Sequence, residues 1–451
     1  MFLLPLFLGG VASVGAVSPL AGVNIAGFDF GVEITGTANL QNAQGPLMVL
    51  GNSDGAGQMQ HFAKNDGLNL FRLPVSWQFL INSSEFAGSG SGSSNATNGP
   101  FNNGTMGPSN NSTRGPFTNS TMMPGNGTTR GNRTPASNAA TGTLDATNFA
   151  EYDMLVQACL ATGATCVIDI HNYARFNNKV IGQGGPSNAD FANLWSQIGT
   201  KYAKEAKIIF GIMNEPHDIP DLSLWAATVQ EAVTAIRAAG ATTQRILLPG
   251  TDFTSAQTFI SNGSAGNLST VKNPDGSLEG LIFDVHKYLD VDNSGTHREC
   301  VSDHVNDTFM PLGAFLKKNN RMAMLSETGG GNTTSCLRDL CATLKFINNN
   351  PDVYLGYAGW AAGGFSPETY ELTMTPRGSN GNFVDQDIVK QCVVETRGVA
   401  SNATANGALS GAAADPGNSK AFQSAGTKGM APASGSGLVL GVMMLRVFSI
   451  L

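Results

Sequence analysis

Two glutamates stand out as candidates for chemistry, because each directly follows a short apolar run. Glu215 belongs to an Asn-Glu-Pro motif at the end of the run 208–214, and Glu327 follows the run 322–326. Two carboxylates can divide the hydrolysis of a glycosidic bond, one as proton donor and the other as nucleophile or base. Either glutamate alone would more simply be a surface carboxylate. The assignment therefore depends on the elements that position them.

Those elements follow from the hydrophobic pattern. Short apolar runs that are typical of β-strands alternate with stretches whose apolar residues are three and four positions apart, as in amphipathic helices. One helix is expected to begin after Ser187 as its N-cap and another to end at Gly240. Eight runs occur, at 23–30, 68–74, 165–171, 208–214, 245–249, 281–286, 322–326 and 354–360. This alternation predicts a (β/α)8 TIM barrel, and a doubly wound sheet is disfavoured because no Gly-rich phosphate loop follows the first run.

A (β/α)8 barrel carries its active site at the carboxyl ends of its strands. Polar and aromatic residues lie at or just beyond the ends of several runs: Arg72, His171, Asn214, His286, Tyr288 and Trp360. Glu215 and Glu327 come from the fourth and seventh runs. We therefore expect their carboxylates to meet at the mouth of the barrel.

Five stretches at these positions carry a family resemblance: VIDIHNYARF, IGQGGPSNADFANLWSQI, FGIMNEPHD, IFDVHKYLDVDNSGTH and SETGGGN. The chain resembles the fungal endo-β-1,4-glucanases (cellulases) of glycoside hydrolase family 5 from about Gly22 to Cys392, apart from residues 83–147. The resemblance implies endo-hydrolysis of β-1,4-glucosidic bonds (EC 3.2.1.4), with Glu215 as acid/base and Glu327 as nucleophile. It also implies supporting or substrate-binding roles for the six residues at the other strand ends.

Physical roles can be assigned to several of these residues. Arg72 and Tyr288 can hydrogen-bond Glu327 and keep it ionised. Asn214 is placed to bind a sugar 2-hydroxyl, a contact that strengthens in the transition state. Trp360 offers an apolar face to a pyranose ring. An ionised nucleophile close to the anomeric carbon predicts a retaining reaction.

The histidines and two polar residues of the first run allow more than one interpretation. His286 can orient its neighbours through hydrogen bonds, whereas His171 is as compatible with a structural role as with substrate contact. Asn24 and Asp29 are interpreted as structural. His217, just after the acid/base, is expected to cap the following helix.

Two departures from the family bear on specificity. Fungal relatives often carry Trp where this chain has Phe176 and Phe253, both expected in loops that line the cleft. No cysteine lies outside 159–392, which leaves no room for a Cys-rich cellulose-binding module. Soluble or amorphous glucan is therefore the expected substrate.

The six cysteines allow 15 pairings. Cys159 and Cys166 flank a short link between a helix and a strand, which favours a local disulfide. The resemblance further implies the pairs Cys300–Cys336 and Cys341–Cys392. No His/Cys cluster has metal-ligand spacing, and we expect neither a cofactor nor a metal.

Other segments are expected to lie outside the barrel domain, which is predicted at 17–82 and 148–396. Residues 83–147 contain no Val, Ile, Cys, Trp, Tyr or Lys but seven Asn-x-Ser/Thr sequons, which predicts a disordered glycosylated insertion. Residues 1–16 resemble a secretory signal. Residues 397–426 form a low-complexity linker, and the apolar end of 427–451 indicates a GPI-anchor signal.

These features predict a secreted monomeric glycoprotein, attached to a membrane where the anchor signal is used. The formal net charge of -7 gives no basis for binding nucleic acid. Two alternatives remain open at this point: a hydrolase of mannan or mixed-linkage glucan using the same carboxylates, and a wall-anchored, non-catalytic carbohydrate-binding protein. Activity on a panel of soluble glucans separates them.

Overall fold

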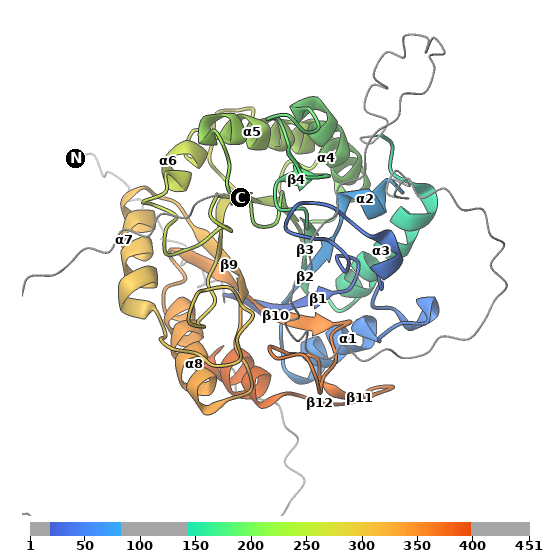
Figure 1. Ribbon diagram of the computed structural model, residues 1–451, viewed down its shortest axis with the longest axis vertical. Helices are drawn as coiled ribbons and strands as arrows, with labels where there is room; N and C mark the ends of the chain where they lie inside the picture. The colour runs from blue at the N-terminus through green and yellow to red at the C-terminus, as the bar shows by residue number, and fades with distance from the viewer. Residues whose placement is uncertain (1–18, 83–141, 398–451) are drawn as a thin grey trace, which may run out of the picture. The chain divides into compact units, whose positions relative to one another are not determined.

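The computed structural model describes residues 19–82 and 142–397, which contain a closed barrel of eight parallel strands (Figure 1). Around the barrel the strands follow the order β1-β10-β9-β8-β7-β6-β3-β2. Their bounds are β1 Leu20–Ala26, β2 Leu70–Val75, β3 Thr165–Ile170, β6 Ile208–Gly211, β7 Arg245–Pro249, β8 Leu281–His286, β9 Ala323–Thr328 and β10 Tyr354–Gly363. The predicted (β/α)8 barrel is confirmed.

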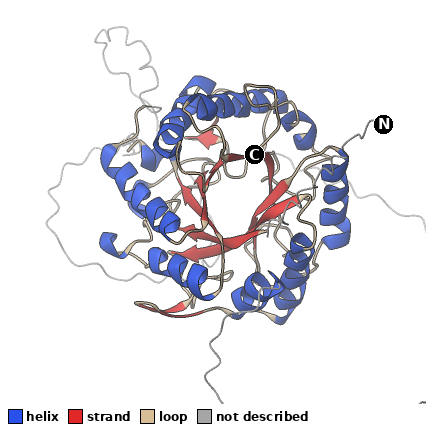
Figure 2. Ribbon diagram, turned by 180° about the vertical axis from the view of Figure 1, so that it is seen from behind, coloured by secondary structure: helices blue, strands red, loops and turns tan. Residues whose placement is uncertain are grey.

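Helices form a ring outside the strands, as the reverse view also shows (Figure 2). They are α1 Gly55–Asn65, α2 Trp77–Leu80, α3 Ala146–Ala161, α4 Asn188–Tyr202, α5 Leu222–Ala238, α6 Ser264–Leu268, α7 Met310–Lys318 and α8 Thr334–Asn348. Short 3-10 helices span Leu40–Asn42, Met48–Leu50 and Glu395–Arg397, and π-helical turns span Val305–Phe309 and Val389–Val394. Two small antiparallel hairpins pair β4 Arg175–Phe176 with β5 Lys179–Val180, and β11 Arg377–Ser379 with β12 Asn382–Val384.

The predicted helix boundaries follow from local chemistry. Ser187 caps α4 in a capping box with Asp190, which satisfies free backbone N–H groups at the helix start. The α5 helix begins at the N-cap Asp221 and is followed by Gly240, whose φ of 94° suits glycine. The first strand ends before the expected residue 30, because the chain turns at Gly27, whose N–H donates to Asp29.

Seven of the eight barrel strands contribute to a ring of apolar side chains that closes the lower interior, and Leu20 of β1 packs against this ring; a polar layer lies above it. The apolar ring consists of Leu70, Val167, Ile209, Leu247, Ile282, Met324, Leu355 and Ala358. Because side chains alternate along a strand, the residues two positions later also face inward. Three of these are Arg72, Asp169 and Asp284, all buried. The apolar interior thus supports a polar floor for the catalytic mouth.

Three disulfides join elements of the barrel: Cys159–Cys166, Cys300–Cys336 and Cys341–Cys392. The first links α3 to β3, and the third links α8 to the turn 389–394. These are the local pair expected from the sequence and the two pairs implied by the resemblance. Disulfides of this number are typical of proteins exported to an oxidising compartment.

The described ranges refine one predicted boundary. Asp145 caps α3, its N–H donates to the Leu80 carbonyl, and the Leu144 N–H donates to Gln197, so residues 144–147 belong to the barrel rather than to the predicted insertion. The signal at 1–16, nearly all of the segment 83–147, the linker and the anchor signal lie outside the described residues. Within 19–82 and 142–397, no helix is long and apolar enough to cross a membrane.

Candidate active site

Glu327 lies near the end of β9, buried at the mouth of the barrel. Its Oε1 accepts a hydrogen bond from Arg72 Nη1 at 2.5 Å and its Oε2 accepts one from the Tyr288 hydroxyl at 2.8 Å. Burial alone raises the pKa of Glu327, but the charges of His286 and Arg72 outweigh burial and hold this pKa below its usual value. Glu327 is therefore an anion with its lone pairs directed by fixed donors.

A shift in strand register brings Glu327 into the site. Along β9, Met324 and Ser326 share one face, so simple alternation would turn Glu327 away from the interior. The pairing of β8 with β9 shifts between Val285 and His286, and His286 comes to lie opposite Glu327. Irregularities of this kind commonly redirect a side chain at a barrel rim.

Arg72 connects the nucleophile candidate to the rest of the polar floor. The side chain is completely buried in β2. Its Nη1 also donates to Asn24 Oδ1, while Nη2 donates to Asn214 Oδ1 at 2.7 Å and lies 3.0 Å from Asp169 Oδ2. A guanidinium shared between two buried carboxylates in this way has a fixed orientation.

Glu215 follows β6 and has a different environment. Its side chain retains 16% exposure, and its Oε1 lies 2.7 Å from His286 Nδ1. The residue has a left-handed backbone, with φ of 42°, so the chain turns sharply where the carboxylate enters the mouth. Glu215 thus combines solvent access with a single strong side-chain partner.

His286 belongs to a hydrogen-bonded chain that leads away from Glu215. His286 Nε2 lies 2.9 Å from Ser326 Oγ, and the Ser326 hydroxyl in turn donates to Asp284. Because Ser326 donates its proton to Asp284, its oxygen is left to accept from His286 Nε2–H. The neutral imidazole can then accept the Glu215 proton at Nδ1. Burial lowers the pKa of His286, but the charges of Glu327 and Glu215 outweigh burial and raise it.

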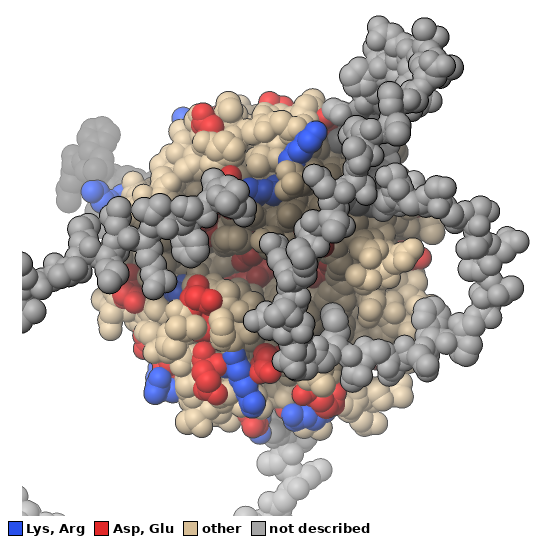
Figure 3. All heavy atoms as spheres, viewed as in Figure 1, with Lys and Arg blue, Asp and Glu red and all other residues tan. Residues whose placement is uncertain are grey.

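The two glutamates lie close enough to act on one bond. One carboxylate oxygen of Glu215, one of Glu327 and a ring nitrogen of His286 all lie within 4.8 Å of one another. The His286 Nδ1 that contacts Glu215 is also 3.6 Å from Glu327 Oε2. In Figure 3, acidic atoms are visible within the hollow at the centre of this face.

An aromatic surface adjoins the carboxylates. Trp360 in β10 is partly exposed and stacks on His171, with ring centroids 5.3 Å apart. Phe365 meets Trp360 edge-on and stacks on Tyr370 at 3.9 Å. A flat, partly exposed indole next to an acid pair suits the apolar face of a sugar ring.

His171 and Asn214 support the floor from beside the aromatic surface. His171 Nδ1 lies 2.8 Å from Asp169 Oδ2, and its Nε2 lies 3.2 Å from the Asn214 amide nitrogen. Both ring nitrogens are thus engaged, which favours the structural interpretation of His171. Asn214 accepts from Arg72 and retains an amide N–H for a ligand.

Two expectations about the rim are wrong. Phe176 does not line the cleft: it is buried in β4, with its ring against Trp77 at 5.1 Å. His217 does not cap a helix, because its Nε2 bonds the Ile34 carbonyl and its ring stacks on Phe253 at 4.5 Å. Phe253 is 38% exposed, as a rim residue should be.

Several supporting residues had no separate signal in the sequence. Asp169 and Asp284 each precede a predicted site residue by two positions, so strand alternation could have identified them as inward-facing. Ser326 directly precedes Glu327, and alternation from Glu327 would have placed it on the opposite face. Asn24, interpreted as structural, donates to the carbonyls of Ser326 and Gly359 and accepts from Arg72, so it fixes the guanidinium.

Metal-ligating groups also converge in ways that sequence spacing does not reveal. In the described ranges, three sets of side chains are close enough to share an ion: Glu215 with His286 and Glu327; Asp290 with Asp292 and His297; and His61 with Asp66 and Asp385. The first set is the site described above. In it, hydrogen bonds within the protein already account for the arrangement of the ligand atoms.

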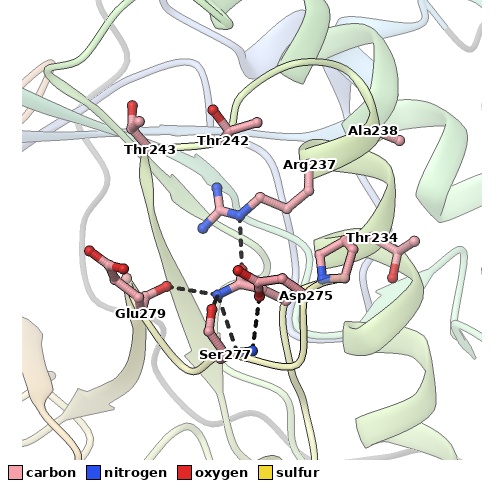
Figure 4. A pocket seen from close by; sticks show the side chains of 11 residues that line it. Thr234, Arg237, Ala238, Thr242, Thr243, Asp275, Ser277 and Glu279 are labelled. Atoms are coloured by element: carbon pink, nitrogen blue, oxygen red, sulfur yellow. Dashed lines mark hydrogen bonds between the residues drawn. The ribbon is translucent and has the colours of Figure 1, made fainter.

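A separate cavity of about 590 Å³ lies between the end of α5 and the loop that leads into β8 (Figure 4). Arg237 reaches into it and donates from Nε to Asn273 at 2.9 Å. The cavity is near the amino end of β8, away from the mouth that holds Glu215 and Glu327. Neither glutamate lines it, and chemistry is assigned to the mouth.

Comparison with known proteins agrees with this geometry. The family described as cellulase (glycosyl hydrolase family 5) matches residues 111–363. Endoglucanase EG-II of Hypocrea jecorina is 48% identical over 377 residues, 83% of this chain and 77% of that protein. The crystal structure of Cel5A (EG2) from the same organism matches with a TM-score of 0.70 at 47% identity, over 84% of this chain and 98% of that one. XacCel5A in complex with cellopentaose matches with a TM-score of 0.62 at 25% identity, over 83% and 98%. The chain therefore belongs to the cellulases of glycosyl hydrolase family 5, as an endo-β-1,4-glucanase (EC 3.2.1.4).

Proposed function

We propose that this endo-β-1,4-glucanase cleaves its substrate with retention of anomeric configuration, using Glu327 as nucleophile and Glu215 as acid/base. The observation that carries the proposal is the approach of the two carboxylates to within 4.8 Å. Retaining glycosidases separate these groups by about 5–5.5 Å, whereas inverting ones need about 6.5–9.5 Å to admit a water. The short separation supports a covalent route.

In the first step, Glu327 attacks the anomeric carbon while Glu215 gives its proton to the departing glycosidic oxygen. The bond from carbon to the leaving oxygen breaks as the glycosyl ester forms, and the leaving sugar departs with the Glu215 proton. Arg72 and Tyr288 support this step because they hold Glu327 ionised before attack.

In the second step, Glu215 removes a proton from water, and the resulting nucleophile displaces Glu327 from the anomeric carbon. The product leaves with its original configuration and Glu215 is protonated again. His286 supports the exchange, because its Nδ1 contacts Glu215 Oε1 and can respond to the change of charge on that carboxylate.

The substrate we propose is a soluble or amorphous β-1,4-glucan. XacCel5A, which shares the fold, was solved with cellopentaose, a β-1,4-glucan fragment. Trp360 provides the sugar-stacking surface next to the carboxylates, and Phe253 adds a smaller exposed ring at the rim. One large and one smaller aromatic surface suit a flexible, hydrated chain better than a crystal face.

Chemical rescue with azide tests the two roles separately. An aryl cellobioside with a good leaving group is offered to Glu215→Ala and to Glu327→Ala, each with sodium azide. The proposal expects β-cellobiosyl azide from Glu215→Ala, through the glycosyl-enzyme, and α-cellobiosyl azide from Glu327→Ala, by direct displacement. The reverse pattern would exchange the assignments, and rescue of neither variant by any azide product would reject the pair.

We also propose that residues 1–16 direct export, that 83–141 form a glycosylated insertion and that 427–451 signal a glycolipid anchor on an otherwise monomeric enzyme. The sequons and apolar ends of the sequence support this, and the three disulfides agree with export. Mass spectrometry of the mature protein is the test. Peptides from 430–451 in that product would exclude the anchor.

A further inference from the structure

Three metal-ligating side chains converge where the β11–β12 hairpin lies against α1, at the lower edge of Figure 1. His61 belongs to α1, Asp66 is the C-cap of that helix, and Asp385 directly follows β12. His61 Nε2 lies 2.9 Å from Asp385 Oδ1 and 3.6 Å from Asp66 Oδ2. The three residues join segments separated by more than 300 positions in the sequence.

The protein groups around Asp66 satisfy only part of its carboxylate. Asp66 Oδ2 is buried and has no hydrogen-bond partner within the described chain. The residue ends α1, where the helix dipole disfavours a negative charge. Burial, together with the charge of Asp385 and a side-chain hydrogen bond to it, raises the pKa of Asp66 to about 7, whereas the charge of His61 lowers it. Two carboxylates and one imidazole so close together can share either a proton or a cation.

We propose that His61, Asp66 and Asp385 bind a divalent cation with one nitrogen and two oxygen ligands. The spacing of the ligand atoms suits an ion about 2.0–2.2 Å from each of them, the usual range for Zn–N and Zn–O bonds. An imidazole with two carboxylates is a donor set for Mn²⁺ or Zn²⁺. The His61 side chain is only 8% exposed, so its ring cannot turn away from the site.

The outer surroundings of His61 complete the site. The Asn65 side-chain nitrogen lies 2.8 Å from His61 Nδ1, so cation binding at Nε2 requires this amide to be turned over. With its oxygen turned to the ring, this amide accepts the Nδ1–H and leaves the Nε2 lone pair for the cation. Phe62 and Phe383 flank the ring, with centroids 5.7 and 5.5 Å away. The imidazole is thus fixed from both α1 and the hairpin.

The cation would fasten a segment that reaches the catalytic mouth. Asp385 precedes Gln386, whose amide donates to the carbonyls of Pro367 and Thr375. Between those two residues lies Tyr370, which stacks on Phe365 beside Trp360. We therefore expect the cation to stabilise this segment and the whole barrel.

Manganese binding tests the site directly. The full-length protein is stripped with EDTA and titrated with Mn²⁺, with free Mn²⁺ counted by electron paramagnetic resonance. We expect Asp66→Asn and Asp385→Asn each to bind one Mn²⁺ fewer than the wild type. Asp307→Asn is the matched control, because Asp307 contacts His304 but belongs to none of the three described sets that could share an ion, and it should bind as the wild type does. Saturating Mn²⁺ should raise the wild-type melting temperature by about 3–6 °C and leave that of the two site variants unchanged.

Activity on a soluble glucan without metal shows that each variant is folded. Equal Mn²⁺ binding by the wild type and both site variants would overturn the proposal. A shared proton in place of a metal gives another pattern: Asp66→Asn melts higher than the wild type in EDTA, and Mn²⁺ has no effect on the wild type. That result would also overturn it.

Discussion

The two glutamates at the mouth of the barrel belong to the same chemistry but are held in opposite ways. Glu327 is 4% exposed at its side chain and receives direct hydrogen bonds from Arg72 and Tyr288. Glu215 is 16% exposed, and its Oε1 lies within hydrogen-bonding distance of His286. Hydrogen-bond donors thus fix the carboxylate of Glu327, whereas the carboxylate of Glu215 contacts a titratable imidazole.

This difference teaches how one site assigns two roles to one residue type. Fixed cationic and hydroxyl donors favour the ionised form of Glu327 at every stage, as a nucleophile requires. In the proposed mechanism, a histidine with a variable proton lets Glu215 be acid in one step and base in the next. The roles follow from the partners rather than from the carboxyl groups themselves.

Replacement of Glu327, the proposed nucleophile, should have the largest effect. Glu327→Gln keeps the size of the side chain but cannot form the glycosyl ester, so we expect kcat to fall by a factor on the order of 10⁵. The melting temperature should change little, since Arg72 still forms its ion pair with Asp169. Steady-state kinetics on a soluble glucan and thermal unfolding measure both. Near-normal turnover would reject the role of Glu327.

Substitution of Arg72, the cation that binds Glu327, should have the second largest effect on activity. Arg72→Lys keeps a charge but loses the fork that joins Glu327, Asn24 and Asn214, and we expect kcat to fall by about 10²–10³. Arg237→Lys, at the other cavity, is the matched control and should keep wild-type kcat. If both variants lost activity equally, a general effect on folding would explain the loss.

The pH profile should separate the two carboxylates. In Tyr288→Phe, Glu327 loses a donor that favours its ionised form, so the acid limb of kcat/KM should move to higher pH. The same depressed pKa contributes stability that is present above the unfolded value of about 4.3 and lost as pH falls through the folded one. Acid unfolding should therefore begin at higher pH in this variant, and an unchanged limb would show that Tyr288 does not hold the anion.

The smallest effect should come from a change in the series of hydrogen bonds that runs from His286 through Ser326 to Asp284. Ser326→Ala removes one hydrogen bond to His286, worth about 1 kcal/mol, and we expect kcat to fall about 5–10-fold with KM unchanged. Ser326→Thr retains a hydroxyl and should recover most of the loss. A change confined to KM would place Ser326 in substrate binding instead.

Much of this arrangement could be predicted from the sequence, because the active-site residues of a (β/α)8 barrel lie at the carboxyl ends of its strands. The positions of Glu215, Glu327, Arg72 and Trp360 followed from that rule and from the family resemblance. The register shift that brings Glu327 inward could not be predicted, since it depends on pairing between β8 and β9.

Long-range convergence was the other feature beyond the sequence. His61 and Asp66 have no metal-ligand spacing by themselves, and Asp385 joins them only through the packing of the hairpin on α1. Phe176 was placed at the rim because its sequence neighbours are loop residues, but its ring packs on Trp77. Burial of a single ring depends on tertiary contacts that local pattern does not encode.

The anomeric configuration of the first product tests the central claim most directly. Proton NMR during the first minutes of hydrolysis of a soluble cello-oligosaccharide distinguishes the anomers before mutarotation mixes them. Attack by Glu327 followed by attack of water inverts the carbon twice, so the β-anomer should appear first. The α-anomer appearing first would mean a single displacement by water, and would contradict both the covalent route and the role of Glu327.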